Sequence, residues 1–135
     1  MSRDAAPLRP YYVLDAPALL ALLNAEEGTE LVQELLPQAV ISTVNLAEVV
    51  ARLSTLGMPE GEIREALTVL GLEAIPFDEE QAFRAGLLAM HTQSLGLSLG
   101  DRARLALAQT AAKTVLTADR VWRKLDIGVN IKLVR

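Results

Sequence analysis

The chain has 135 residues, of which 51% are hydrophobic, and this suits one domain with a sizeable core. Cysteine is absent, which excludes a disulfide scaffold, a cysteine-ligated zinc site and thiol chemistry. No apolar run approaches the roughly 18 residues of a membrane span, and the first ten residues lack the apolar stretch of a signal peptide. We therefore expect a soluble, cytoplasmic protein with no membrane partner.

The net charge of −4 is unevenly distributed along the chain. Residues 1–99 contain 5 basic and 14 acidic side chains, whereas residues 100–135 contain 8 basic and 3 acidic ones. An acidic protein has weak non-specific affinity for nucleic acid, but a local cluster of Arg and Lys can still bind phosphates. A solvated charged surface is the simpler interpretation of the same charges.

In chain order, residues 1–10 contain two Pro and two Arg, and we expect them to form a flexible extension ahead of one domain over residues 11–135. Short apolar runs predict strands, and helical patterns fill most of the chain between them. This alternation predicts an α/β fold. The predicted strands are 11–14, 40–42, 74–76, 114–117 and 129–134, and the predicted helices begin at Pro17 and cover 29–36, 44–56, 60–70, 79–94, 101–113 and 120–125.

Two acidic residues follow predicted buried strands. Asp15 closes the run YYVLD, and Asp119 follows VLTA. Open α/β sheets bind ligands at the carboxyl ends of their strands. Clustered carboxylates resist ionising together unless a hard cation such as Mg²⁺ or Mn²⁺ neutralises them, so the pattern suggests a metal site. A capping role before the next helix is the alternative for each.

Two further acids lie on predicted helices. Asp101 begins a helix that is apolar nearly all round, so we expect this helix to be largely buried, although Asp101 could simply cap it. Glu48 shares a helical face with Asn45 and Arg52, opposite a core stripe, and a solvated face is the alternative there. The stripe consists of Leu46, Val49, Val50 and Leu53.

Four motifs occur in one order: YVLDAPALL, STVNLAEV, LGLSLGDR and VLTADRVW. In this order they resemble the PIN-domain ribonucleases, especially the VapC-like toxins of type II toxin–antitoxin systems. The resemblance implies a PIN-like fold, with a five-stranded parallel sheet sandwiched by helices. It also implies catalytic roles for Asp15, Glu48, Asp101 and Asp119, with Asp15, Asp101 and Asp119 holding Mg²⁺ (or Mn²⁺). Supporting hydrogen bonds are implied for Asn45 and Thr117.

The expected activity is that of a metal-dependent endoribonuclease, which hydrolyses RNA phosphodiester bonds as the toxin of a toxin–antitoxin pair. The resemblance also implies a homodimer neutralised by a cognate antitoxin. A partner segment carrying Arg or Lys would suit the cluster of Glu26, Glu27, Glu30 and Glu34. Candidate contacts to RNA phosphates are Arg102, Arg104, Arg120 and Arg123, which flank two of the acids.

Some features are expected to stay outside the chemistry. Trp122 is better explained as a core anchor than as a base-stacking residue, and His91 as a structural or surface residue. Pro17 stands where many PIN-domain relatives carry Ser or Thr, so one hydroxyl that could help to place the substrate is missing.

Other functions remain open at this point. A phospho-acceptor receiver domain is disfavoured, because the first strand ends in a single Asp and the third predicted strand in Pro76 and Phe77. A PIN-fold RNA-binding or interaction module commonly lacks one or more of the acids, and all four are present. A housekeeping PIN nuclease without an antitoxin fits the same residues.

Overall fold

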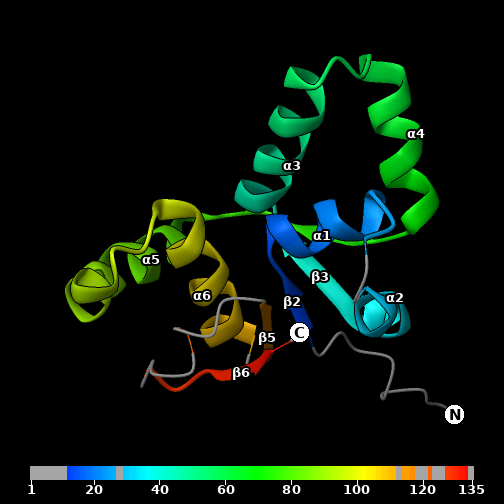
Figure 1. Ribbon diagram of the computed structural model, residues 1–135. Helices are drawn as coiled ribbons and strands as arrows, with labels where there is room; N and C mark the ends of the chain where they lie inside the picture. The colour runs from blue at the N-terminus through cyan, green and yellow to red at the C-terminus, as the bar shows by residue number, and fades with distance from the viewer. Residues whose placement is uncertain (1–11, 27–28, 112–113, 118–121, 123–126, 134–135) are drawn as a thin grey trace, which may run out of the picture.

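A computed structural model describes residues 12–26, 29–111, 114–117, 122 and 127–133 of the chain. Its centre is a five-stranded sheet in the order β4-β3-β2-β5-β6, and all neighbouring strands are parallel (Figure 1). The α/β class and the five-stranded parallel sheet are therefore confirmed. The strands are β2 (Tyr12–Leu14), β3 (Ala39–Ser42), β4 (Glu73–Ile75), β5 (Thr114–Thr117) and β6 (Asn130–Leu133).

Helices cover both faces of the sheet (Figure 1). The helices are α1 (Ala16–Leu23), α2 (Glu30–Leu35), α3 (Thr43–Thr55), α4 (Glu60–Leu70), α5 (Glu79–Thr92) and α6 (Leu99–Ala111). Two short 3-10 turns, η2 (Leu36–Gln38) and η3 (Gln93–Leu95), follow α2 and α5. In the described part of the chain, no helix is long and apolar enough to cross a membrane.

The sheet divides the core because alternate residues of a strand point to opposite faces. Val13, Val40 and Val115 are buried against α5 and α6. On the other face, Leu14 and Leu116 pack with α1 and α2, and Ile41 packs with α1, α3 and α4. Both faces of the central strands are therefore buried, which explains why the sequences of these strands are continuous apolar runs.

The order of the strands reverses around β2. From β2 the chain moves outward to β3 and β4, and it then returns to β5 on the other side of β2. In parallel sheets, ligands bind in the crevice beside the carboxyl ends of the strands at such a reversal. Asp15 directly follows β2, and Thr117 is the last residue of β5.

The expected elements are present, but several boundaries move. The predicted helix 101–113 begins two residues earlier, at Leu99, because Ser98 supplies its cap. The predicted helix 79–94 ends at Thr92 and continues as η3. The predicted strand 74–76 is shifted by one residue, since proline is poorly suited to a strand interior. The predicted extension 1–10 and most of the predicted helix 120–125 lie outside the described residues.

Candidate functional site

Asp15 is held at the end of the central strand. It is the N-cap of α1, and its Oδ1 accepts a hydrogen bond of 2.7 Å from the backbone N–H of Ala18. Pro17 occupies the first turn of α1, where a missing N–H costs no helical hydrogen bond. The residue is only 3% exposed. The Asp15 side chain therefore both caps α1 and belongs to the candidate site.

Asp101 is fixed by its own helix terminus. The N–H of Ser98 donates to Oδ2 of Asp101 at 2.9 Å, and the N–H of Asp101 donates to Oγ of Ser98 at 3.1 Å. This reciprocal pair is a capping box with Asp in the third helical position. It aims the other carboxylate oxygen of Asp101 away from the cap, toward Arg104.

Arg104 lies one turn after Asp101 and is buried, with 5% of the residue exposed. Its Nη2 donates to Oδ1 of Asp101 at 2.7 Å, and its Nη1 lies 4.0 Å from Oδ2 of Asp15. The guanidinium carbon is 4.1 Å from the centre of the Trp122 ring. Arg104 is thus a buried cation that is shared by two carboxylates and stacked on the core tryptophan.

Glu48 reaches the same region from α3. Asn45, one turn earlier, donates through Nδ2 to Oε1 of Glu48 at 2.9 Å and to the carbonyl oxygen of Gly100 at 3.1 Å. A Cβ on Gly100 would collide with the carboxylate of Glu48, so glycine permits this approach. The start of α3 is therefore tied to the start of α6.

Asn45 corrects the sequence interpretation. The helical pattern places it on the solvated face with Glu48 and Arg52, yet it is fully buried. The reason is that α6 packs across the start of α3 and covers this side chain. Glu48 and Arg52, further along α3, are exposed.

These side chains line one cavity of about 530 Å³ at the carboxyl edge of the sheet. It receives carboxylates from the N-cap of α1, from α3 and from α6, a threonine from the end of β5, and two arginines. Its lining residues are Asp15, Ala16, Pro17, Leu20, Glu48, Arg52, Asp101, Arg104 and Thr117. The mixture of charges suits a ligand that carries both a cation and phosphate groups.

Burial raises the pKa of the Asp15 carboxyl above its ordinary value of 3.8. The positive charge of Arg104, the N–H of Ala18 and a hydrogen bond with Thr117 lower the pKa in part, and the charge of Asp101 raises it. The net direction is upward. The ionised carboxylate is therefore held in a position where additional positive charge would stabilise it.

The structure brings together some of the predicted site residues and not others. The cavity is lined by the predicted residues Asp15, Glu48, Asp101, Arg104 and Thr117. Asn45 does not line it but donates a hydrogen bond to Glu48, which does. Arg102 points elsewhere, because its Nη1 donates to the carbonyl oxygen of Ala85 on α5 at 2.9 Å. Outside the described residues lie Asp119, Arg120 and Arg123. Trp122 is 1% exposed and belongs to the core, and His91 is exposed.

Two residues at the cavity were not singled out from sequence. Arg52 follows Glu48 by four residues, a spacing that places both on one helical face, so its presence in the lining could have been found. Gly100 precedes Asp101, but no local pattern indicates that a side chain from α3 must pass so close to it.

The donors fit a divalent cation in kind, since carboxylate oxygens are the ligands that Mg²⁺ and Mn²⁺ prefer. Within the part of the chain that the structure describes, no three acidic, His or Cys side chains lie close enough to hold one ion. One oxygen of Asp101 is taken by Arg104 and the other by the cap.

Comparison with known proteins identifies similar chains. Residues 12–128 match the PIN domain. No curated protein matches by sequence. Among solved structures, DNA-bound VapBC from Salmonella typhimurium has a TM-score of 0.75 at 18% identity, over 93% of this chain and 99% of that one. VapBC2 from Rickettsia felis, bound to a promoter DNA fragment, has a TM-score of 0.73 at 20% identity, over 90% and 97%.

A third similar structure, FitAcB from Neisseria gonorrhoeae, has a TM-score of 0.64 at 21% identity and covers 89% of this chain and 95% of that one. At these identities the likeness is one of fold. It spans nearly the whole length of each chain.

Proposed function

The chain belongs to the PIN-domain family, and from this premise we propose that it is a metal-dependent endoribonuclease and the toxin of a toxin–antitoxin pair. The observation that carries the proposal is the convergence of Asp15, Glu48 and Asp101 on one cavity at the strand reversal. Asp119 is proposed to join them, by its place in the motif order.

In this proposal, Asp15, Asp101 and Asp119 hold Mg²⁺ or Mn²⁺. When bound, such an ion makes hydroxide available near neutral pH and stabilises charge developing on a phosphate. The chain itself positions the reactants. Asn45 orients the carboxylate of Glu48, and the hydrogen bond with Thr117 favours the ionised form of Asp15.

Arginine side chains at the cavity would bind the RNA backbone. Arg52 is exposed at the rim, and Arg104 lies inside. A guanidinium can bind phosphate oxygens through two parallel hydrogen bonds. Arg120 and Arg123 remain candidates for the same role. Arg102 is a weaker candidate, since its guanidinium is engaged with α5.

Removal and return of the metal tests the proposed activity. Purified protein is expected to cleave single-stranded RNA in Mn²⁺ or Mg²⁺, to stop in excess EDTA, and to recover when Mn²⁺ is restored. The products are followed on denaturing gels. Undiminished cleavage in EDTA would contradict the proposal.

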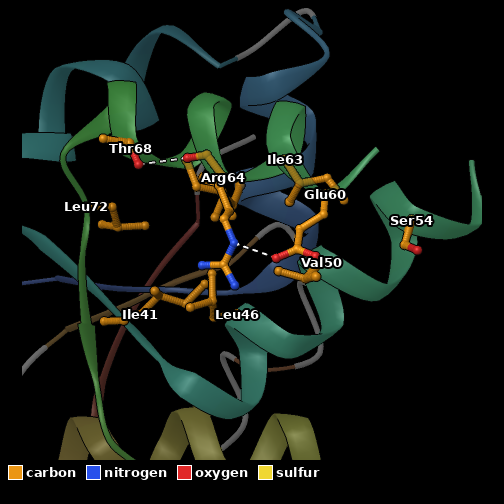
Figure 2. A pocket seen from close by; sticks show the side chains of 12 residues that line it. Ile41, Leu46, Val50, Ser54, Glu60, Ile63, Arg64, Thr68 and Leu72 are labelled. Atoms are coloured by element: carbon orange, nitrogen blue, oxygen red, sulfur yellow. Dashed lines mark hydrogen bonds and ion pairs between the residues drawn. The ribbon is translucent and has the colours of Figure 1, made fainter. Parts of the chain in front are cut away.

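An antitoxin partner is proposed because three of the similar structures are named VapBC, and one of these is described as a member of a family of toxin–antitoxin systems. A further similar structure is described as a toxin–antitoxin complex. A groove of about 590 Å³ lies between α3 and α4 and is floored by the sheet (Figure 2). Figure 2 shows Leu46 and Val50 of α3 facing Ile63 of α4 across it. Its apolar lining suits hydrophobic anchors of a partner segment.

The groove lies in the acidic part of the sequence. The groove belongs to residues 1–99, which hold the excess of negative charge. Glu26, Glu30 and Glu34 are exposed on the same part of the chain, and Glu27 lies outside the described residues. We therefore expect the antitoxin segment to carry Arg or Lys beside apolar side chains.

Co-expression with the product of the neighbouring gene tests the partner. A stable complex with suppressed RNA cleavage is expected, and Glu26→Lys with Glu30→Lys should slow association and lessen its dependence on salt. Cleavage without any inhibitory neighbour would favour a housekeeping nuclease. Association that is equally fast after the charge reversal, at every salt concentration, would exclude these glutamates as the docking surface.

A homodimer is proposed through α5. Phe83, Leu87 and Met90 follow one another at helical spacing and are 65%, 70% and 81% exposed. A second copy of the chain would bury this apolar stripe. Light scattering should show a dimer for the parent and a monomer for Phe83→Ser with Leu87→Ser. A dimer that survives both substitutions would place the interface elsewhere.

A further inference from the structure

Arg104 stands among the acids that the proposed function assigns to metal. It donates to Asp101 at 2.7 Å and lies 4.0 Å from Asp15, so one guanidinium contacts two of the three proposed ligands. The Arg104 side chain is 6% exposed and the Asp101 side chain 29%, so water screens this pair less than it screens a surface salt bridge. The acids are thus partly neutralised by the chain itself.

The surroundings hold the guanidinium in place without saturating it. The Trp122 ring lies against one face at 4.1 Å, which favours a cation. Its Nε is buried and has no hydrogen-bond partner within the described residues. A guanidinium has five N–H donors, and among the residues that the structure describes one of them makes a short bond to a carboxylate.

The same oxygen of Asp101 is needed twice. Oδ2 accepts a hydrogen bond in the capping box, so Oδ1 is the oxygen left for a metal ion, and Oδ1 is bound by Arg104. A divalent cation that takes Oδ1 must share it with a positive charge or displace that charge. Like charges within a few ångströms repel strongly where water is excluded.

We infer that Arg104 is a resident cation that competes with the divalent metal for Asp101, so that metal binding requires the guanidinium to leave this carboxylate. The inference rests on the proposed metal-dependent function. Arg104 acts on affinity for the ion, and once released its free donors can bind a phosphate of the substrate.

Direct metal binding, measured without RNA, tests the competition. Arg104→Met keeps the volume of the aliphatic stem and removes the charged guanidinium, and we expect it to bind Mn²⁺ about tenfold more tightly than the parent by calorimetry or electron paramagnetic resonance. Arg104→Lys keeps the charge and should bind Mn²⁺ less tightly than Arg104→Met. Arg52→Met is the matched control, because Arg52 lines the same cavity but is exposed.

The unaltered protein offers a second readout. Trp122 is the only tryptophan in the chain, and Arg104 lies on its ring. Mg²⁺ should therefore change tryptophan emission in the parent, over the same concentrations at which it binds. The change should vanish in Arg104→Met.

The outcomes separate the two proposals. If the parent and Arg104→Met bind Mn²⁺ equally, or the variant binds it more weakly, the competition is refuted. Metal-dependent cleavage of RNA by the parent then leaves the nuclease assignment standing. If neither binds Mn²⁺ nor cleaves RNA, the proposed function fails and the competition fails with it.

Discussion

Two of the hollows on this molecule are similar in volume but differ in the kind of side chain that lines them. The carboxylate cavity, of about 530 Å³, rests on buried polar side chains, among them Asp15, Arg104 and Thr117. The groove between α3 and α4, of about 590 Å³, is largely apolar, and its charged side chains are at the surface. There Glu60 and Arg64 form a pair at 2.8 Å with side chains 78% and 77% exposed (Figure 2).

The difference between the two hollows shows where charged side chains affect the stability of the fold. A buried ion needs partners with good geometry, so removing the nearest partner of Arg104 leaves a buried charge unsatisfied. An exposed pair is screened by water and contributes little. The two hollows have similar volumes. They differ in how much free energy of unfolding is lost when their charged side chains are changed.

The largest effect expected is on RNA cleavage. Asp15→Asn and Glu48→Gln should each lower the rate by about 10²-fold or more, since each removes charge that acts on the reacting centre. Glu60→Gln, the matched change in the groove, should leave the rate unaltered. Initial rates at saturating Mn²⁺ measure this, and a minor drop for both cavity variants would argue against the assignment of these acids.

A smaller effect is expected on folding. Asp101→Asn should lower the free energy of unfolding in EDTA by about 2 kcal/mol, because it leaves the buried Arg104 without its short ion pair. Glu60→Gln should change it by less than about 0.5 kcal/mol. Urea denaturation compares the two. Equal losses would mean that burial does not distinguish the two pairs.

The groove should matter for binding alone. Leu46→Ala and Leu67→Ala should each weaken binding of the proposed antitoxin by about tenfold, as expected when an apolar anchor loses its pocket, while RNA cleavage by the free protein stays unchanged. Titration of labelled antitoxin gives the dissociation constants. Unchanged affinity in both variants would place the partner on another surface.

The smallest effect concerns pH. Because the pKa of Asp15 is raised in the folded protein, the folded state holds this proton more tightly than the unfolded chain does. The stability that this proton contributes is present at low pH and is lost as pH rises through the raised pKa. In EDTA, Asp15→Asn should therefore melt at a higher temperature than the parent at pH 7, and the gain should shrink toward pH 4.

Asp78→Asn is the matched control for this pH effect. Asp78 is also an N-cap, since it accepts from the N–H of Gln81 at 2.9 Å, but it is exposed. Asn caps a helix about as well as Asp, so capping is preserved in both variants. A gain of the same size at Asp78 would assign the effect to capping and remove the argument from burial.

Much of the fold could be predicted from the sequence because its signals are local. The buried strands appear as short apolar runs such as TVLT, and the helix 60–70 matches its observed bounds. The predicted end of one strand at Pro76 fell one residue late, since a short strand is bounded by its neighbour's register as well as by its own residues.

The site was harder to predict in detail. The positions of Asp15 and Asp101 follow from a strand end and a helix start, which are local features. The burial of Asn45 depends on α6, which lies 55 residues further along the chain. The inward direction of Arg104 depends on Trp122 and two acids from separate elements. Such contacts between distant segments leave no periodic pattern.

A side chain at Gly100 would have different effects on the stability of the fold and on the candidate site. It lies in the first turn of α6, where alanine would favour the helix by up to about 1 kcal/mol. The atom in the way of a Cβ belongs to the movable end of Glu48 and not to the backbone. Selection for thermostability alone would therefore tend to accept Gly100→Ala. The displacement of the Glu48 carboxylate would be detected only by a screen for activity.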